Sequence, residues 1–428
     1  RNRRAPFMKI LHHTTGSRLG AAVLFSLLST SVIAAQEKAA ADGATEPKEE
    51  LSFIDAFTKG KVNATFNYRF EYVDQDGIAD TGIASTLRTT LGYRTEKFHG
   101  FQGYLEFEDV TDLGGKYLHQ NAGFGNYNNG VTGRPVIADP AGTNIQQVYL
   151  DYFYRKSMAR LGAQEIMLDD QRFVGNVGWR QHHQSFDALM LATEELENAW
   201  FAFSYVRKVK TVTRRSIDTD TFIFNGHYKF KDIGQLTIYD YYIDLTTAPS
   251  VASTNTLGAE FKGLRKANEE WSYRYEAEIA TQSDVADNPQ SISAMYYHLM
   301  LGGIYKGFGL RVGYEVLGSD SGNIAFQTIL GTNHKFNGWA DKFLATPANG
   351  LKDLYVKIDG PLGPTKWALI YHNFTADEGG ADYGMEFDGI ITYKAEWGQT
   401  FGLKFAFYDA DSFATDTTKA WVWTGFKF

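Results

Sequence analysis

Apolar and polar residues alternate with a period of two in segments of about ten residues, from Lys61 to the C-terminus. In the final segment Ala420 and Val422 share one face, and Trp421 and Trp423 share the other. This alternation is typical of β-strands that have one apolar face and one polar face. The pattern predicts eighteen strands, at 61–73, 83–95, 100–111, 145–155, 158–167, 184–194, 197–208, 220–230, 235–245, 255–263, 270–280, 294–305, 308–317, 351–359, 365–374, 383–394, 399–409 and 419–428.

The last predicted strand ends on an aromatic residue, Phe428. A strand in that position leaves an unpaired edge unless the sheet closes, and in an apolar medium each unsatisfied backbone group costs several kcal/mol. We therefore expect the last strand to pair with the first. A terminal aromatic residue after alternating apolar positions also resembles the assembly signal of bacterial outer-membrane barrels.

Connection lengths distinguish a membrane barrel from a soluble one, which alternation alone does not. Every second connection is short, such as 156–157, whereas those between them are longer and reach 112–144, 168–183 and 318–350. This sorting is typical of outer-membrane barrels, in which short turns face the periplasm and long loops face the outside. The predicted fold is an all-β, transmembrane antiparallel β-barrel of 18 strands, with 16 as the alternative and with both termini in the periplasm.

The composition agrees with a chain that crosses the membrane by β-strands. Aromatic residues make up 15% of the chain and cysteine is absent, which excludes disulfides and thiolate metal sites. After residue 35 no apolar run approaches the roughly 20 residues of a spanning helix.

The N-terminal region reads as a secretory signal. Lys9 and Arg18 precede the apolar stretch 19–33, and Ala34 and Ala35 supply small residues at a cleavage site. We predict upstream residues at 1–7, a signal peptide at 8–35, a flexible periplasmic leader at 36–58 and the barrel at 59–428. An uncleaved anchor helix is the alternative to the signal peptide.

The charge of the chain argues against nucleic acid as a partner. The net charge is −8, and removal of residues 1–35 would take away five basic residues and no acidic one, which leaves −13.

One stretch, 160–189, resembles the alginate-export family of outer-membrane proteins. It reads RLGAQEIMLDDQRFVGNVGWRQHHQSFDAL, and 87–109 and 337–356 look like two further segments of that family. Ala163 departs from the family, because an arginine is common at that position. The resemblance implies a monomeric 18-stranded porin through which an anionic polyuronate diffuses past a positively charged constriction.

The same stretch supplies the candidate constriction. Asp170, Arg172, Trp179 and Arg180 are predicted to lie on a loop that folds into the lumen, where guanidinium groups pair with sugar carboxylates and Trp179 offers a face for a sugar ring. In the alternative interpretation, Asp170 pairs with Arg172 or a wall arginine and only pins the loop, and the wall arginines are internal salt-bridge partners. The full set of predicted pore residues is Arg69, Arg88, Arg94, Arg160, Asp170, Arg172, Trp179, Arg180, Asp187, Arg274 and Arg311.

Other chemistry finds little support in the sequence. His182 and His183 are adjacent and point to opposite faces of an extended chain, so no metal site or cofactor is predicted. No Gly-x-Ser-x-Gly nucleophile elbow occurs, and we predict no enzyme activity.

The predicted function is therefore a porin with a water-filled lumen for passive diffusion of anionic polysaccharide or oligosaccharide. The alternatives are a general small-solute porin and, with less support, a plugged-barrel enzyme or adhesin. Expected partners are outer-membrane lipid, lipopolysaccharide, the anionic saccharide and, through Phe428, the barrel-assembly machinery.

Overall fold

The computed structural model describes residues 51–247 and 252–428. The predicted signal peptide and residues 36–50 of the predicted leader lie outside the described residues. Residues 53–58 of that leader form the helix α1 (Phe53–Thr58), so the prediction of a flexible segment is wrong there. The helix forms because Ser52 and Asp55 make a reciprocal capping box, and Glu96 donates its backbone N–H to the Ala56 carbonyl.

Eighteen strands of the described residues form one antiparallel sheet, as the sequence predicts. Each strand begins and ends within a few residues of its predicted bounds, because the alternating segments are long and separated by turn residues. The strands are β1 (Lys61–Gln75), β2 (Gly82–Arg94), β3 (Phe101–Gly114), β4 (Gly142–Tyr154), β5 (Ser157–Gln164), β6 (Ser185–Thr193), β7 (Ala199–Lys210), β8 (Ser216–Phe230), β9 (Gly234–Ile243), β10 (Thr254–Lys266), β11 (Trp271–Asp284), β12 (Ser293–Tyr305), β13 (Phe308–Leu317), β16 (Leu351–Leu362), β17 (Thr365–Thr375), β18 (Asp382–Lys394), β19 (Thr400–Ala410) and β20 (Thr417–Lys427).

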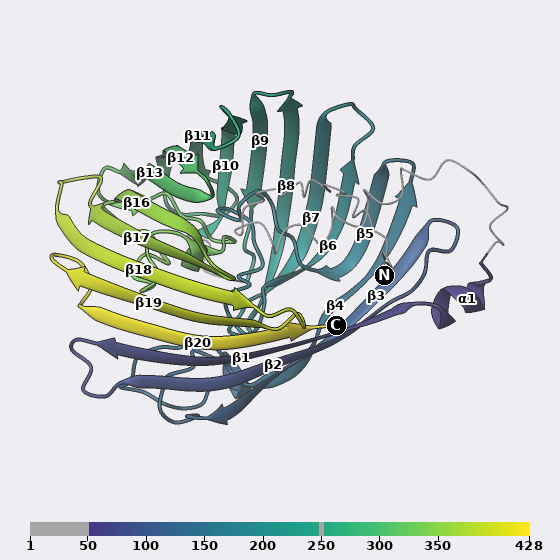
Figure 1. Cartoon of the computed structure of the whole chain (residues 1–428), viewed down its shortest axis with the longest axis horizontal. Helices are drawn as coiled ribbons and strands as arrows, with labels where there is room; N and C mark the ends of the chain where they lie inside the picture. Colours follow the sequence, from purple (N-terminus) through teal and green to yellow (C-terminus); the bar gives the residue numbers. More distant parts are fainter. Residues whose placement is uncertain (1–50, 248–251) are drawn as a thin grey trace, which may run out of the picture. The chain divides into compact units, whose positions relative to one another are not determined.

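The sheet closes between its first and last strands. Strand β20 pairs antiparallel with β1 from Thr417↔Gln75 to Lys427↔Thr65, and Figure 1 shows the two strands side by side. Phe428 continues the pairing, because its N–H and its carbonyl both bond to the backbone of Ala64. This closure confirms the predicted seam and satisfies the edges that a lipid environment would penalise.

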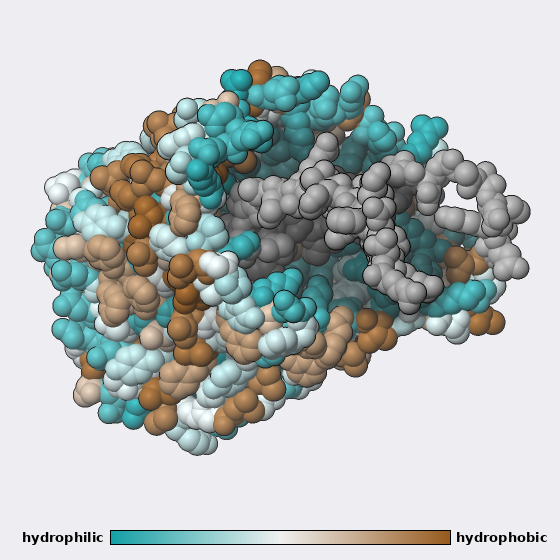
Figure 2. All heavy atoms as spheres, in the orientation of Figure 1, coloured by the Kyte–Doolittle hydropathy of each residue, from teal (hydrophilic) through white to brown (hydrophobic). Residues whose placement is uncertain are grey.

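The outer face of the barrel is apolar and the inner face is polar. Leu301 is 71% exposed and Leu161 is 63% exposed on the outside, whereas Arg69 and Glu71 are buried on the inside. Figure 2 shows hydrophobic side chains gathered on the outer wall. This distribution fits a barrel that faces lipid rather than water.

Long and short connections lie at opposite ends of the barrel. The loops 115–141, 165–184 and 318–350 follow β3, β5 and β13, whereas turns such as 155–156 and 306–307 lie at the other end. The loop 115–141 carries η1 (Gly125–Tyr127), and the loop 318–350 carries β14 (Ser319–Asp320), β15 (Ile324–Ala325) and η3 (Asn333–Lys335). Among the described residues no helix is long and apolar enough to cross a membrane.

Two of these loops build an apolar core inside the barrel. Phe173 lies 5.2 Å from Tyr239 and 5.3 Å from Tyr296 between ring centroids, and Phe326 lies 5.4 Å from Tyr296. A parallel bridge between Val174 and Leu330 joins the two loops. The expectation of a lumen filled by water is therefore wrong at the level of these loops, because their apolar side chains pack against inward-facing tyrosines of the wall.

Candidate functional site in the barrel lumen

Arg180 is the centre of a buried charge cluster where three loops meet the wall. Its guanidinium lies 3.3 Å from Glu71 on β1, 3.5 Å from Asp139 and 3.5 Å from Asp341. Arg69, also on β1, bonds to Asp139 and to the Trp179 carbonyl. We call Arg69, Glu71, Asp139, Arg180 and Asp341 the hub, because they tie the three long loops to one strand.

The hub holds its loop carboxylates in the charged form. Burial works to raise the pKa of Asp139, but the guanidinium groups of Arg69 and Arg180 bring that pKa below its usual value. Burial likewise opposes the charge on Asp341, whose pKa lies well below its usual value because His334, Lys419 and Arg180 surround it. Lys419 contributes an ion pair of 2.7 Å to Asp341.

His334 links the hub to Trp179. Its Nδ1 lies 2.5 Å from Asp341 and its Nε2 lies 2.7 Å from the Lys404 ammonium. Burial and the nearby charge of Lys404 bring the pKa of His334 well below its usual value. At neutral pH the ring is therefore uncharged, so Nδ1–H donates to Asp341 and Nε2 accepts from Lys404.

Arg172 and Asp170 anchor the loop 165–184 elsewhere in the lumen. Arg172 forms an ion pair of 2.7 Å with Glu315 on β13 and donates to Asn337 at 2.8 Å. Asp170 accepts the Arg172 backbone N–H at 3.0 Å, and Lys335 donates to the Asp170 carbonyl. Burial disfavours the Asp170 charge, yet Lys335 and Lys262 bring its pKa below the usual value.

These contacts favour the interpretation that the loop is pinned by its own charges. Trp179 stacks on His334 with ring centroids 5.1 Å apart and carries the Lys404 ammonium 3.9 Å from its centre. Protein side chains thus occupy the surroundings of the ring that was predicted to hold a sugar. Arg172 and Arg180 are likewise buried in pairs with protein carboxylates.

Three wall arginines are held by neighbours on the wall. Arg88 pairs with Glu108 at 2.7 Å, and Arg160 forms a bidentate pair with Asp151 at 2.6 and 3.0 Å. Arg94 donates to the Tyr149 hydroxyl at 2.8 Å.

Asp187 does not line the lumen. It is exposed on the same face of β6 as Leu189 and Leu191, whereas Phe186 points inward and is fully buried. The prediction assumed that apolar residues point outward. Phe186 breaks that rule because it joins the interior apolar core.

A row of cations crosses the lumen wall near the short turns. Arg274 on β11 is in register with Gly302, Gly302 with Arg311 on β13, and Arg311 with Lys357 on β16. A Cβ atom at Gly302 would lie 2.9 Å from Cγ of Arg311, so glycine leaves room for the arginine side chain. Asp359 pairs with Arg311. We call Arg274, Arg311 and Lys357 the cationic row.

The sequence predicted Arg274 and Arg311 as separate pore residues. By its parity Lys357 was also predicted to face the lumen, but it was not included in the predicted site. Lys357 lies between the exposed Val356 and Ile358, so its inward direction follows from the alternation. Only the register of the strands, which the sequence does not supply, brings the three cations to one level.

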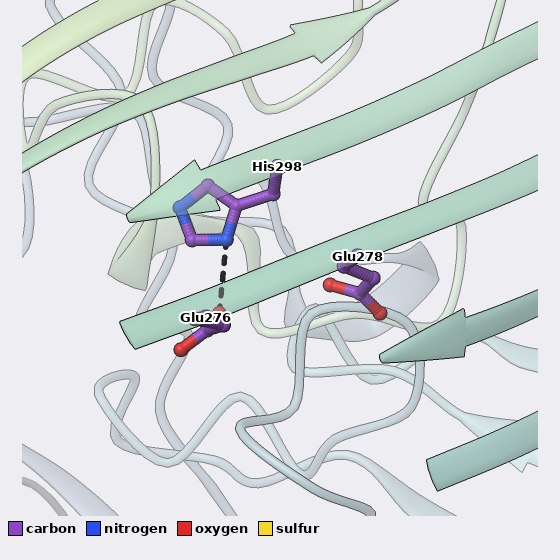
Figure 3. A group of neighbouring side chains, drawn as sticks. All are labelled: Glu276, Glu278 and His298. Atoms are coloured by element: carbon purple, nitrogen blue, oxygen red, sulfur yellow. Dashed lines mark hydrogen bonds and ion pairs between the residues drawn. The ribbon is translucent and has the colours of Figure 1, made fainter. Parts of the chain in front are cut away.

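An acidic row lies four residues along each strand from the cationic row, further from the short turns. Registered positions on β10 to β16 place Glu260, Glu278, His298, Glu315 and Asp353 side by side. Figure 3 shows Glu276, Glu278 and His298, whose ligand atoms lie within 4.8 Å of one another, a spacing that a metal ion could bridge.

The contacts of these three side chains do not need a metal. His298 Nδ1 lies 2.9 Å from Glu276, its Nε2 lies 3.0 Å from the Tyr355 hydroxyl, and Glu278 accepts from Tyr239 at 2.8 Å. An ion would have to displace one of these partners. The group is best described as a hydrogen-bonded network of the wall.

A sequence model of the family described as "Alginate export" matches residues 100–316, which is half of the chain. The chain belongs to the alginate export family. The matched residues run from β3 to β13 and include the loop 165–184, Arg274 and Arg311.

Solved structures show the same fold as this member of the alginate export family. Pseudomonas aeruginosa OccK9 (OpdG) has a TM-score of 0.69 at 12% identity and covers 87% of this chain and 99% of its own. Acinetobacter baumannii OccAB3 has a TM-score of 0.68 at 14% identity, with 87% and 100% covered. Pseudomonas aeruginosa OpdK, solved with vanillate, has a TM-score of 0.66 at 12% identity, with 86% and 98% covered. No curated protein matches the chain by sequence.

Family and fold together give the coarse function. This member of the alginate export family is an outer-membrane porin built on a closed barrel of 18 strands. Its lumen differs from a simple polar channel, because the hub ties three long loops to the wall and two of them form the apolar core.

Proposed function

We propose that this porin passes anionic saccharides of the polyuronate class by passive diffusion, and that the cationic row contacts their carboxylates. The row carries this proposal, because strand register brings three basic side chains to one level of the lumen wall, and its two arginines, Arg274 and Arg311, are partly exposed. Arginine pairs with carboxylates through two parallel hydrogen bonds, and rings of basic side chains favour anions in pores.

The geometry of the lumen supports a route that runs past the cationic row. Arg274 and Arg311 are each the fourth residue of a strand that follows a short turn, so the row lies toward the short-turn end. We place that end, and both termini, in the periplasm. The loops 165–184 and 318–350 follow the opposite ends of their strands, on the other side of the row. Arg274 and Arg311 are partly exposed, as a route past them requires.

We also propose that the barrel-assembly machinery recognises Phe428. Its ring is 65% exposed beside Phe426, with centroids 4.6 Å apart, at the end of the closing strand. An exposed aromatic end on β20 is available to a partner before the seam forms.

The test is block of single-channel current by an oligouronate in a planar bilayer. In the double variant Arg274→Gln/Arg311→Gln we expect the blocking concentration to rise roughly tenfold or more, because each lost charge-assisted pair is worth about 1 kcal/mol or more. The reversal potential in a salt gradient should also shift toward cation preference.

Lys306→Gln is the matched control, because Lys306 lies in a short turn at the same end and pairs with Glu270 on the surface. Its block should equal that of the wild type. Equal block in the double variant and the control would contradict the role of the row. An open channel that oligouronates do not block would favour a general small-solute porin.

A further inference from the structure

The outer wall carries an apolar groove at the short-turn end, across β4 to β8. Its volume is about 390 Å³ and its lining is almost wholly apolar. The large side chains that line it, such as Tyr152, Leu191 and Phe203, face outward, away from the hub and the cationic row, so the solute route does not use the groove.

Small residues among aromatic ones create the groove. Along one line of the sheet Tyr152 is in register with Ala159, Ala159 with Leu191, and Leu191 with Phe203. Ala159 is a notch between larger neighbours, since Tyr152, Leu191 and Phe203 stand 40–45% exposed on the same face.

The polar groups of the groove are already satisfied. Ser157 and Thr193, which lie toward the turns, bond to each other through their hydroxyls at 2.8 Å. The groove therefore presents hydrocarbon and aromatic surface to its occupant. In a barrel that faces lipid, the occupant with matching chemistry is an acyl chain.

Charges of both signs stand at the open end of the groove. Arg155 and Lys156 form the exposed turn between β4 and β5, and Glu194 and Glu197 lie exposed in the turn between β6 and β7. In the described part of the chain, none of these four side chains makes an ion pair within 4 Å. The two turns are adjacent, because the Glu194 N–H bonds to the Lys156 carbonyl at 2.9 Å.

We propose that this groove binds a phosphatidylethanolamine molecule of the inner leaflet. One acyl chain lies over Ala159, Arg155 and Lys156 bind the phosphate, and Glu194 and Glu197 bind the ammonium group. A zwitterionic amine headgroup fits better than an anionic one, because the two turns offer basic and acidic partners together. The proposal uses the periplasmic orientation of the short turns and is independent of the solute.

Native mass spectrometry of the purified full chain tests the site with phosphatidylethanolamine and phosphatidylglycerol of identical acyl chains. The wild type should retain roughly threefold to tenfold more of the amine lipid, because exposed ion pairs contribute about 0.2–1 kcal/mol each. Glu194→Gln/Glu197→Gln should remove that preference, and Arg155→Gln/Lys156→Gln should lower retention of both lipids.

The groove itself is tested by Ala159→Phe, which fills the notch. Ala277→Phe is the matched control, because Ala277 is an exposed, outward-facing alanine of β11 outside the groove. Heat-modifiable migration in gels verifies that each variant is folded. Loss of the bound lipid in Ala159→Phe alone supports the site. Equal retention in both variants, equal retention of the two lipids by the wild type, or a dimer in place of bound lipid would overturn it.

Discussion

Replacing Arg180 by alanine should release the long loops from the wall. The change leaves Glu71, Asp139 and Asp341 without the cation that they share in a buried place. Removal of one partner from a buried ion pair costs about 3–5 kcal/mol when the remaining charge is left unpaired. Arg69 and Lys419 still pair with Asp139 and Asp341 in the variant, so we expect a smaller cost of about 1–3 kcal/mol. The open state of the loops should therefore gain roughly tenfold or more in population.

Two measurements report that release. Protease added from the long-loop side should cut within 165–184 and 318–350 in Arg180→Ala but not in the wild type, and the single-channel conductance should increase. Arg160→Ala is the matched control, because Arg160 is also buried but pairs with Asp151 of the neighbouring wall strand. If the two variants behave alike, the hub has no special role in holding the loops.

Acid should release the same loops without any substitution. The pKa of His334 is lowered by burial, so the unlocked state takes up a proton more readily, and stability falls as pH drops below about 6.5. The surrounding cations also lower the pKa values of Asp139 and Asp341, although burial alone would raise them. Their contribution is present above about pH 4 and is lost as pH falls further.

Each proton that only the released state takes up lowers the stability of the docked loops by up to about 1.4 kcal/mol per pH unit. We expect tryptophan fluorescence to change in two steps, because Trp179 stacks on His334 and Trp339 is buried in the same region. His334→Gln should remove the change that begins as pH falls below about 6.5 and keep the one that begins below about pH 4. A wild-type spectrum that is constant from pH 7 to pH 3 would contradict the proposed coupling.

Local patterns were sufficient to predict the wall of the barrel. The alternation at β1 or β13 is readable in sequence because lipid outside and polar groups inside select residues of opposite character at successive positions. The seam followed from the same reasoning, since a lipid environment does not tolerate an open edge.

The interior was less predictable, because it is assembled from distant segments. Glu71, Asp139, Arg180 and Asp341 come from one strand and three loops, and no spacing in the chain relates them. The arginines of 160–189 look like pore residues in sequence, and only the structure shows the carboxylates that bind them. Phe186 illustrates the limit of the alternation rule, because its inward direction depends on an apolar core that loops supply.

That enclosed core has a thermodynamic consequence. Apolar side chains on the outer wall stay in contact with hydrocarbon whether the loops are docked or released, so detachment of the loops changes nothing for them. Phe173, Phe326 and their tyrosine partners, by contrast, would meet water on detachment, so the hydrophobic effect acts mainly on the contents of the cylinder. Urea should therefore detach the loops from the lumen at a lower concentration than the one that unfolds the hydrogen-bonded strands of the barrel.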